Sequence, residues 1–207
     1  MKIIAPSYEI EKGISGAEIL HKLEKIGRVC YKSEGNISQD SAENFIRRII
    51  KSGHESVIEH ASVTVRIVCD RGVSHELVRH RIASYSQEST RYCNYAQDRF
   101  GSELAFIKPC FWEEGSEAYQ VWVKEMASIE TAYFELLQMG EEPQKARSIL
   151  PNSLKTEIVA TMNLRAWRNF FKLRTHKSAH PQMREIALPL LQKFKKTIPI
   201  VFDDILA

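Results

Sequence analysis

The strongest constraint on the fold is an alternation of side chains over residues 61–69. Val63, Val65 and Ile67 occupy every second position, and mainly polar or small residues lie between them. Alternation of this kind, with β-branched residues on one side, predicts a strand that buries one face. Residues 154–162 repeat the alternation and predict a second strand of the same type.

Much of the remaining chain has apolar residues at the three- and four-residue spacing of helices. A short strand is expected over 2–6 and another short element around Phe106. Mixed helix and strand content predicts an α/β fold, and 207 residues suit one domain covering 1–207. The helices are expected over residues 17–30, 41–51, 73–78, 116–139, 143–150, 164–173 and 182–196.

Several small polar residues and glycines are expected to set the helix ends. Ser74 is the expected N-cap of the helix over 73–78, and Asn163 of the helix that begins at residue 164. Gly53 and Gly140 follow predicted helices and are expected to end them.

Composition excludes several classes of protein. Hydrophobic residues at 43% and charged residues at 27% are ordinary globular values, and a net charge of +3 is too small for a protein that coats nucleic acid. No apolar run approaches the roughly 20 residues of a membrane span, and the N-terminus resembles no signal peptide. We therefore expect a cytoplasmic protein with no membrane or nucleic-acid partner. Its four scattered cysteines are expected to be reduced thiols, with no metal site.

The segment from Arg79 to Tyr92 holds the most chemical information. Its arginines offer planar guanidinium groups that suit phosphate or carboxylate oxygens. Hydroxyl groups between them can donate to the remaining oxygens, and Tyr85 and Tyr92 can stack on a planar base. The segment predicts an anionic, planar ligand such as a nucleotide, with a solvated basic loop as the alternative. The residues concerned are Arg79, Arg81, Ser84, Tyr85, Ser86, Ser89, Thr90, Arg91 and Tyr92.

Arg79-His80-Arg81, followed after seven residues by Ser89 and then by Arg91-Tyr92, resembles the signature of the flavin-dependent thymidylate synthases. Other parts of the chain are similar to the same family. These parts are Gly53–His60, Ala146–Pro151, Asn163–Arg174 and His180–Ile186, the last with Pro181 where the family has alanine.

The resemblance implies a central, mainly antiparallel sheet flanked by helices, and a homotetramer with active sites between subunits. It implies reductive methylation of dUMP to dTMP, with 5,10-methylenetetrahydrofolate as carbon donor, FAD as hydride carrier and NADPH as reductant. No cysteine nucleophile is implied. The chain has no Gly-x-Gly-x-x-Gly after a strand, which agrees with a flavin site outside the Rossmann type.

The resemblance also implies roles for individual residues. Arg174 would activate the uracil ring by stabilising negative charge on N3 and the carbonyl groups. Glu76 stands where the family has glutamine, and a carboxylate there can only accept hydrogen bonds. His54 would lie near the isoalloxazine, and either His54 or His180 would meet the folate. The implied flavin-binding residues are Ser56, Arg79, His80, Arg81, Gln87, Asn163, Leu164, Arg165 and Asn169. The implied dUMP-binding residues are Glu76, Leu77, Val78, Arg79, Gln87, Glu88, Ser89, Thr90, Arg91, Arg147 and Arg174.

Other interpretations of these residues stay open. His54 and His60, with the neighbouring glutamates, suggest a metal site, although their spacing does not place two ligands on one helix face. Cys93 or Ser89 is a conceivable nucleophile. Without the resemblance, Arg165 and Arg168 would be assigned to a solvated helix face. The rival functions are a single-stranded nucleic-acid binder and a flavin or nucleotide enzyme of other specificity.

Overall fold

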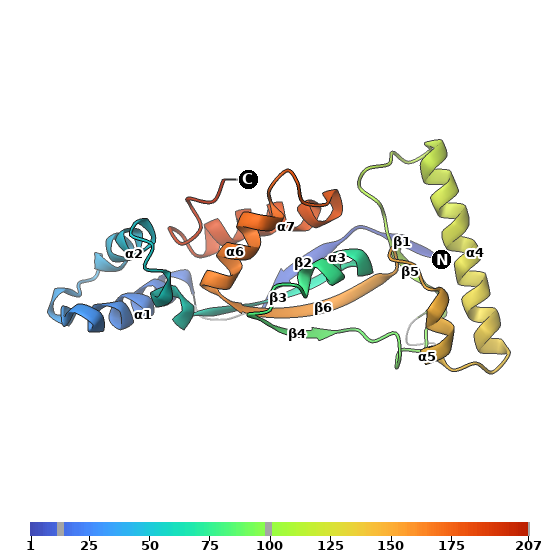
Figure 1. The fold of residues 1–207 in the computed structure, drawn as a ribbon, viewed down its shortest axis with the longest axis horizontal. Helices are drawn as coiled ribbons and strands as arrows, with labels where there is room; N and C mark the ends of the chain where they lie inside the picture. The colour runs from blue at the N-terminus through green and yellow to red at the C-terminus, as the bar shows by residue number, and fades with distance from the viewer. Residues whose placement is uncertain (12–14, 98–100, 207) are drawn as a thin grey trace. The chain divides into compact units, whose positions relative to one another are not determined.

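The structure is a computed structural model that describes residues 1–11, 15–97 and 101–206 (Figure 1). The chain divides into two compact units. Unit 1 contains Met1–Tyr8, Arg66–Arg79 and Tyr85–Val159. Unit 2 contains Glu9–Val65, His80–Ser84 and Ala160–Ala207. Strands β3 (Ser62–Asp70) and β6 (Lys155–Asn163) each contribute residues to both units.

Two sheets are present among the described residues. The larger is antiparallel, with four strands in the order β2-β3-β6-β4, where β2 is Ser7–Ile10 and β4 is Ser84–Gln87. In the smaller sheet β1 (Lys2–Ile4) pairs in parallel with β5 (Ala105–Ile107), with Ile3 opposite Phe106. The predicted α/β class with an antiparallel sheet is therefore confirmed.

The predicted alternation of the two long strands is confirmed by burial. Val65, Ile67 and Cys69 on β3 are almost completely buried. Ile158 and Ala160 on β6 are also inaccessible to solvent. Each strand thus directs one row of side chains into the core, as the period of two requires.

Unit 1 has its core around the helix α4 (Glu117–Gln138). Trp122, Met126 and Tyr133 pack with Phe106 and Leu154 in one buried cluster. The unit also contains α3 (Arg71–Leu77), α5 (Pro143–Ala146) and the 3₁₀ turn η5 (Arg147–Ile149).

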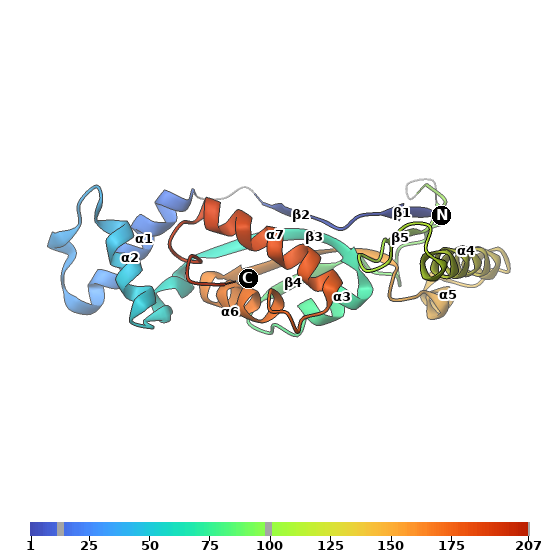
Figure 2. The ribbon, with the colours of Figure 1, turned by 90° about the horizontal axis from the view of Figure 1, so that it is seen from above.

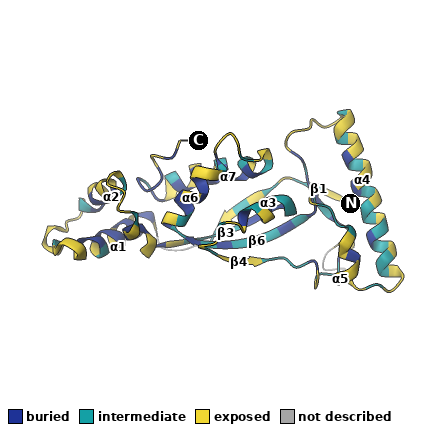
Figure 3. Cartoon of the chain, viewed as in Figure 1, coloured by how far each residue is buried: buried dark blue, intermediate teal, exposed yellow. Residues whose placement is uncertain are grey.

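Burial along α4 covers only one side of the helix among the described residues (Figure 3). Val121 is 61% exposed, although it belongs to the wide apolar surface that the sequence indicates. Apolar residues of this helix extend beyond a single face in the sequence, which predicts burial against more than one partner.

Unit 2 has an aromatic core between α6 (Leu164–Arg174) and α7 (Pro181–Thr197), which lie side by side in Figures 1 and 2. Trp167 stacks on Phe171 at 5.7 Å between ring centroids, and Phe194 and Phe202 surround them. Trp167 also donates its indole N–H to the Val63 carbonyl oxygen at 3.0 Å, which ties α6 to β3.

The remainder of unit 2 is a helical layer made of α1 (Gly16–Arg28) and α2 (Ser41–Lys51). A Cβ atom at Gly27 would lie 2.7 Å from the Phe45 ring, so the close approach of these helices requires glycine at this position. Three 3₁₀ turns complete the layer: η1 (Val29–Tyr31), η2 (Glu34–Asn36) and η3 (Glu55–His60).

Most predicted helix ends are confirmed. Asn163 accepts a hydrogen bond from the Ala166 N–H at 2.8 Å and caps α6. Gly53 and Gly140 take φ values of +71° and +87° directly after the C-cap residues of α2 and α4. The prediction that Ser74 is the N-cap is wrong, because β3 leads directly into α3. Asp70 caps α3 by accepting a hydrogen bond from the Val73 N–H at 2.8 Å.

Sequence reasoning missed β2 and β4, which are only four residues long. β4 lies inside the basic segment from Arg79 to Tyr92. No helix among the described residues has the length and apolar character needed to cross a membrane.

Candidate functional site

The basic segment begins where α3 ends in unit 1. Tyr85 on β4 donates its hydroxyl to the Leu77 carbonyl oxygen at 2.8 Å. This bond satisfies a carbonyl group at the helix end and ties β4 to α3. Burial raises the pKa of Tyr85 to about 12, so the phenol remains a donor at neutral pH.

Gln87 points toward the interior of unit 1. Its Nε2 donates to Ser74 Oγ at 2.9 Å and to Thr156 Oγ1 at 3.1 Å, and both hydroxyl residues are fully buried. These bonds use both amide protons. If Gln87 contacts a nucleotide or a flavin, it does so through its carbonyl oxygen.

Glu88 is neutralised within unit 1. One carboxylate oxygen accepts from Lys155 Nζ at 2.8 Å, and the other accepts from the Tyr95 hydroxyl at 2.8 Å. Burial and the Glu88 carboxylate raise the pKa of Tyr95, which keeps this phenol protonated. The Glu88 backbone N–H is already donated to the Glu157 carbonyl oxygen at 2.8 Å, so the remaining acceptor sites of the carboxylate and the backbone carbonyl oxygen are the groups left for a nucleotide.

Two cations of unit 1 are connected through α5. Arg91 Nε donates to Gln144 Oε1 at 3.3 Å, and Arg147 follows α5 in η5. Both guanidinium groups are exposed, and neither forms an ion pair within the described part of the chain. Two planar cations without carboxylate partners suit a dianionic phosphate.

The other predicted dUMP-binding residues of unit 1 are near these groups in the sequence and differ in burial. Thr90 is 6% exposed, and Ser89 Oγ accepts from the Arg91 N–H at 3.3 Å. Leu77 is 1% exposed, whereas Val78 is 40% exposed. Glu76 is half-buried and Arg79 is exposed.

Unit 2 holds Arg174, the predicted catalytic residue, at the last position of α6. Its Nε donates to Nε2 of His80 at 3.0 Å. A ring nitrogen that accepts this bond must be unprotonated, so His80 is neutral in this arrangement. The His80 ring also meets the Phe170 ring edge-on at 5.1 Å between centroids. The helix end, the imidazole and the aromatic ring together orient the Arg174 guanidinium.

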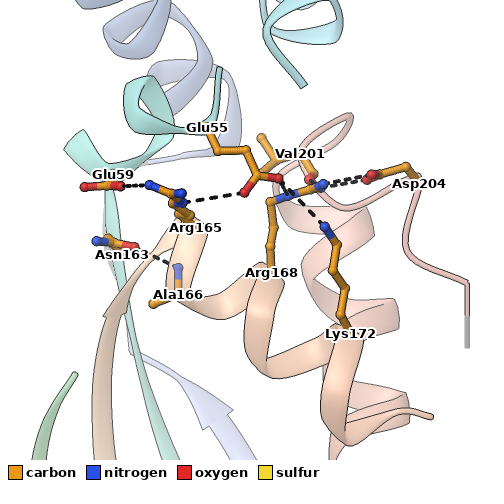
Figure 4. A network of polar contacts seen from close by, with 9 residues as sticks. All are labelled: Glu55, Glu59, Asn163, Arg165, Ala166, Arg168, Lys172, Val201 and Asp204. Carbon is orange, nitrogen blue, oxygen red and sulfur yellow. Dashed lines mark hydrogen bonds and ion pairs between the residues drawn. The ribbon is translucent and has the colours of Figure 1, made fainter. Parts of the chain in front are cut away.

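A network of charges links α6 to η3 and to the C-terminal segment (Figure 4). Arg168 is 2% exposed and donates to both carboxylate oxygens of Asp204, at 2.6 and 2.7 Å. It also donates to the Val201 carbonyl oxygen and to Glu55 at 3.0 Å. Burial lowers the pKa of Arg168, but the Asp204 and Glu55 carboxylates outweigh burial and raise it. The assignment of Arg168 to a solvated helix face is therefore wrong.

Arg165 is the exposed counterpart of Arg168 on the same helix. Its Nη1 lies 2.6 Å from Glu59, and its Nε lies 3.7 Å from Glu55. These carboxylates raise the pKa of Arg165. Since its side chain is 53% exposed, the assignment to a solvated face holds for this arginine.

The remaining flavin-binding candidates of unit 2 are mostly accessible. Ser56, Arg81 and Asn169 are exposed, whereas Leu164 is fully buried and gives its N–H to the Ala61 carbonyl oxygen at 3.0 Å. Arg81 forms no ion pair with another described residue. Exposed hydroxyl, amide and guanidinium donors fit the anionic and polar groups of a flavin dinucleotide.

The two predicted sets of residues thus divide largely between the two units. Unit 1 holds Glu76–Arg79, Gln87–Arg91 and Arg147 of the dUMP set, and unit 2 holds Arg174. Unit 2 also holds the flavin set apart from Arg79 and Gln87.

Cysteine and metal chemistry have little support among the described residues. Burial, followed by the neighbouring Asp70, raises the pKa of the Cys69 thiol to about 12. Cys93 is half-buried, and Cys30 and Cys110 are exposed. No group of three or more histidine, cysteine or acidic side chains in the described ranges can hold a metal ion.

Sequence reasoning missed the structural role of Arg168. One signal was available, because residues 164, 168 and 171 share a helix face and both Leu164 and Phe171 are core residues. The partners Asp204 and Glu55 lie far away in the chain and give no local signal.

Residues 18–200 match the family described as "Thymidylate synthase complementing protein". The flavin-dependent thymidylate synthase of Pyrococcus furiosus is 41% identical over 161 residues, which are 77% of this chain. The chain spans 65% of the length of that relative. The flavin-dependent thymidylate synthase of Geobacter sulfurreducens is 37% identical over 86% of this chain and 78% of its own length.

A solved structure shows the same fold. It is a UMP/dUMP methylase, PolB, from Streptomyces cacaoi, bound with 5-Br dUMP. Superposition gives a TM-score of 0.79, covering 98% of this chain and 96% of the PolB chain, at 24% sequence identity.

Proposed function

The chain belongs to the flavin-dependent thymidylate synthase family, and on this premise we propose that it converts dUMP to dTMP by reductive methylation. The carbon donor is 5,10-methylenetetrahydrofolate and NADPH is the reductant. The observation that carries the proposal is the exposure of two guanidinium groups of unit 1, Arg91 and Arg147, neither of which is ion-paired among the described residues; Arg91 is bound to Gln144, three residues before Arg147 in the chain. Such a pair is suited to the phosphate of a nucleotide.

Around this phosphate site, unit 1 offers further groups to the nucleotide. Ser89 contributes a hydroxyl group, Thr90 a backbone group, and Glu88 its acceptor oxygens, because its N–H is donated to Glu157. Gln87 contributes its carbonyl oxygen, because Ser74 and Thr156 take its amide protons. The other contacts of the proposed dUMP site come from Glu76, Leu77, Val78, Arg79 and Arg174.

Arg174 is the proposed catalytic residue. Carbon–carbon bond formation at C5 of uracil is easier when negative charge on N3 and the carbonyl groups is stabilised. A guanidinium group supplies that stabilisation without losing a proton at any working pH. The Arg174 Nε donates to His80, and the four N–H groups on the terminal nitrogens are the donors that would meet the uracil edge.

FAD, when bound, carries the hydride that reduces the transferred carbon. Ser56, His80, Arg81, Asn163, Leu164, Arg165 and Asn169 would hold it, together with Arg79 and Gln87. Arg165 would bind a flavin phosphate in exchange for one of its two carboxylate contacts. Asn163 caps α6 with its oxygen and can still donate from its amide nitrogen.

The assembly is proposed to be a cytoplasmic homotetramer with active sites between subunits. Exposed apolar side chains on α4 and at its C-cap supply a surface for such contacts, since Val121 and Met139 are 61% and 77% exposed. No nucleic-acid partner is proposed.

Tritium release from [5-³H]dUMP tests the function. We expect release that requires FAD, NADPH and methylenetetrahydrofolate together. Arg174→Ala should lower the rate by about a hundredfold or more, because one charge-stabilising donor is lost. Flavin absorbance of the purified variant shows whether cofactor binding survives the substitution.

Two results would contradict the proposal. A folded, flavin-loaded wild type that releases no tritium would exclude the synthase reaction. Release that persists unchanged in Arg174→Ala would keep the reaction but remove Arg174 as its activating group.

A further inference from the structure

A cavity of about 540 Å³ lies in unit 2 beside His54, at the end of the α1–α2 layer. Three residues of α2 and its C-cap supply one wall: Phe45, then Arg48, Ile49 and Ser52, which follow it by three, four and seven residues. The segment after α1 supplies the opposite wall. The residues of that wall are Arg28, Tyr31, Ser33 and Asn36.

Arg28 is a structural part of this cavity. Its guanidinium group donates to Glu24 at 2.8 and 2.6 Å, and Glu24 is completely buried. The same guanidinium carbon lies 4.9 Å from the centre of the Phe45 ring. Since Glu24 neutralises it, Arg28 shapes the wall but does not attract an anion.

Arg48 differs from Arg28 in having no counter-ion. Its side chain is exposed, and it forms no ion pair or side-chain hydrogen bond with the described residues. An unpaired guanidinium in a cavity is a good site for a carboxylate or a phosphate.

Tyr31 adds an uncovered aromatic surface. It is 67% exposed at the end of η1, and the next residue, Lys32, has a φ of +47°. Left-handed backbone is uncommon for a residue other than glycine, and here the Lys32 N–H donates to the Val29 carbonyl oxygen at 3.3 Å. This tight turn presents the Tyr31 ring at the cavity.

We infer that this cavity binds the anionic aryl end of a co-substrate, with the ring on Tyr31 and the negative charge on Arg48. Ser33, Asn36 and Ser52 offer hydrogen bonds to an amide or hydroxyl group between ring and charge. The inference rests on the proposed function, which requires two such molecules. A folate ends in an aminobenzoyl-glutamate, and NADPH ends in an adenosine 2′-phosphate.

Binding of two fragments tests the inference without catalysis. The probes are p-aminobenzoyl-glutamate and adenosine 2′,5′-bisphosphate, titrated calorimetrically into the purified chain. Arg48→Met should weaken binding of one probe by about tenfold to a hundredfold, the size of a charge-assisted hydrogen bond. Tyr31→Leu should weaken binding of the same probe by about threefold, through lost stacking.

Arg47→Met is the matched control, because it removes the same charge from the same helix and Arg47 does not line the cavity. It should leave the affinity unchanged. Weakened binding of the aminobenzoyl probe supports a folate site, and weakened binding of the bisphosphate supports an NADPH site.

Failure of both probes to bind the wild type would overturn the inference, as would equal losses in Arg48→Met and Arg47→Met. A chain that binds a probe through Arg48 but releases no tritium from dUMP would keep the subsite and refute the synthase. Release of tritium from dUMP by a chain that binds neither probe would keep the synthase and refute the subsite.

Discussion

At the scale of single residues, burial separates two arginines that look equivalent in the sequence. Arg165 and Arg168 both face carboxylates, but Arg168 is 2% exposed and Arg165 is 53% exposed. Removing a buried cation leaves carboxylates without their partner, whereas an exposed pair contributes little.

Arg168→Ala should therefore lower the free energy of unfolding by about 2–4 kcal/mol. This is less than a fully buried pair would lose, because Asp204 is half exposed. Arg165→Ala should change it far less, because the ion pairs of this exposed arginine contribute little to stability. Urea unfolding followed by circular dichroism measures both values. Equal losses of unfolding free energy in the two variants would show that burial does not set the contribution of each arginine to stability.

The pH dependence of stability should identify Asp204. Its hydrogen bond from Arg168 holds the pKa of this carboxyl below its ordinary value of 3.8. The folded chain thus binds this proton less readily than the unfolded chain does. The contribution of ionised Asp204 to the free energy of unfolding is complete above about pH 4, and it is lost as the pH falls through the pKa of Asp204 in the folded chain.

We expect Asp204→Asn to be less stable than wild type at neutral pH. This difference should shrink below about pH 4, as wild type loses the ionised partner of Arg168. Urea midpoints measured between neutral pH and about pH 3 give the comparison. A constant difference across that range would mean that the charge of Asp204 does not stabilise the fold.

At the scale of elements, Asn163 has two possible roles that substitutions can separate. Its side chain caps α6, and the resemblance also assigns it to the flavin. Asn163→Ala removes the cap and should cost about 1 kcal/mol of stability. Asn163→Asp keeps an acceptor at the positive end of the helix and should preserve stability.

Flavin affinity provides the second measurement on these variants. Both substitutions remove the amide donor, so both should weaken FAD binding if Asn163 contacts the cofactor. Normal FAD affinity in Asn163→Asp would limit Asn163 to its capping role.

Helices were predictable because each has an apolar stripe of its own. The helix predicted over residues 41–51 coincides with α2, and the helix predicted over 164–173 ends one residue before α6 does. β4 was not predictable, since its inward residues are Tyr85 and Gln87 and its contacts with Leu77, Ser74 and Thr156 are made by polar groups. A hydrophobic pattern cannot reveal a strand that is held by hydrogen bonds.

The site shows a similar limit. A motif can indicate that Glu88 and Arg174 matter, but not that Glu88 is occupied by Lys155 and Tyr95 or that His80 orients Arg174. Those partners come from distant segments, and only the fold brings them together.

At the scale of the whole molecule, the chain path bears on how the two units unfold. The chain passes between them five times, and β3 and β6 each continue from one unit into the other. Loss of either strand would remove core residues from both units, such as Ile67 from unit 1 and Val65 from unit 2. We therefore expect one cooperative transition, in keeping with the single domain predicted over 1–207.

Tryptophan fluorescence can test this expectation. Trp112 and Trp122 belong to unit 1 and Trp167 to unit 2. Trp167→Phe leaves reporters in unit 1 only, and the double variant Trp112→Phe/Trp122→Phe leaves a reporter in unit 2 only. In each variant, the urea midpoint from fluorescence should coincide with that from circular dichroism, which monitors both units. Comparison within one variant removes the effect of the substitution on stability. A fluorescence midpoint that differs from the circular dichroism midpoint in both variants, and in opposite directions, would mean that the units unfold separately and that the chain behaves as two domains.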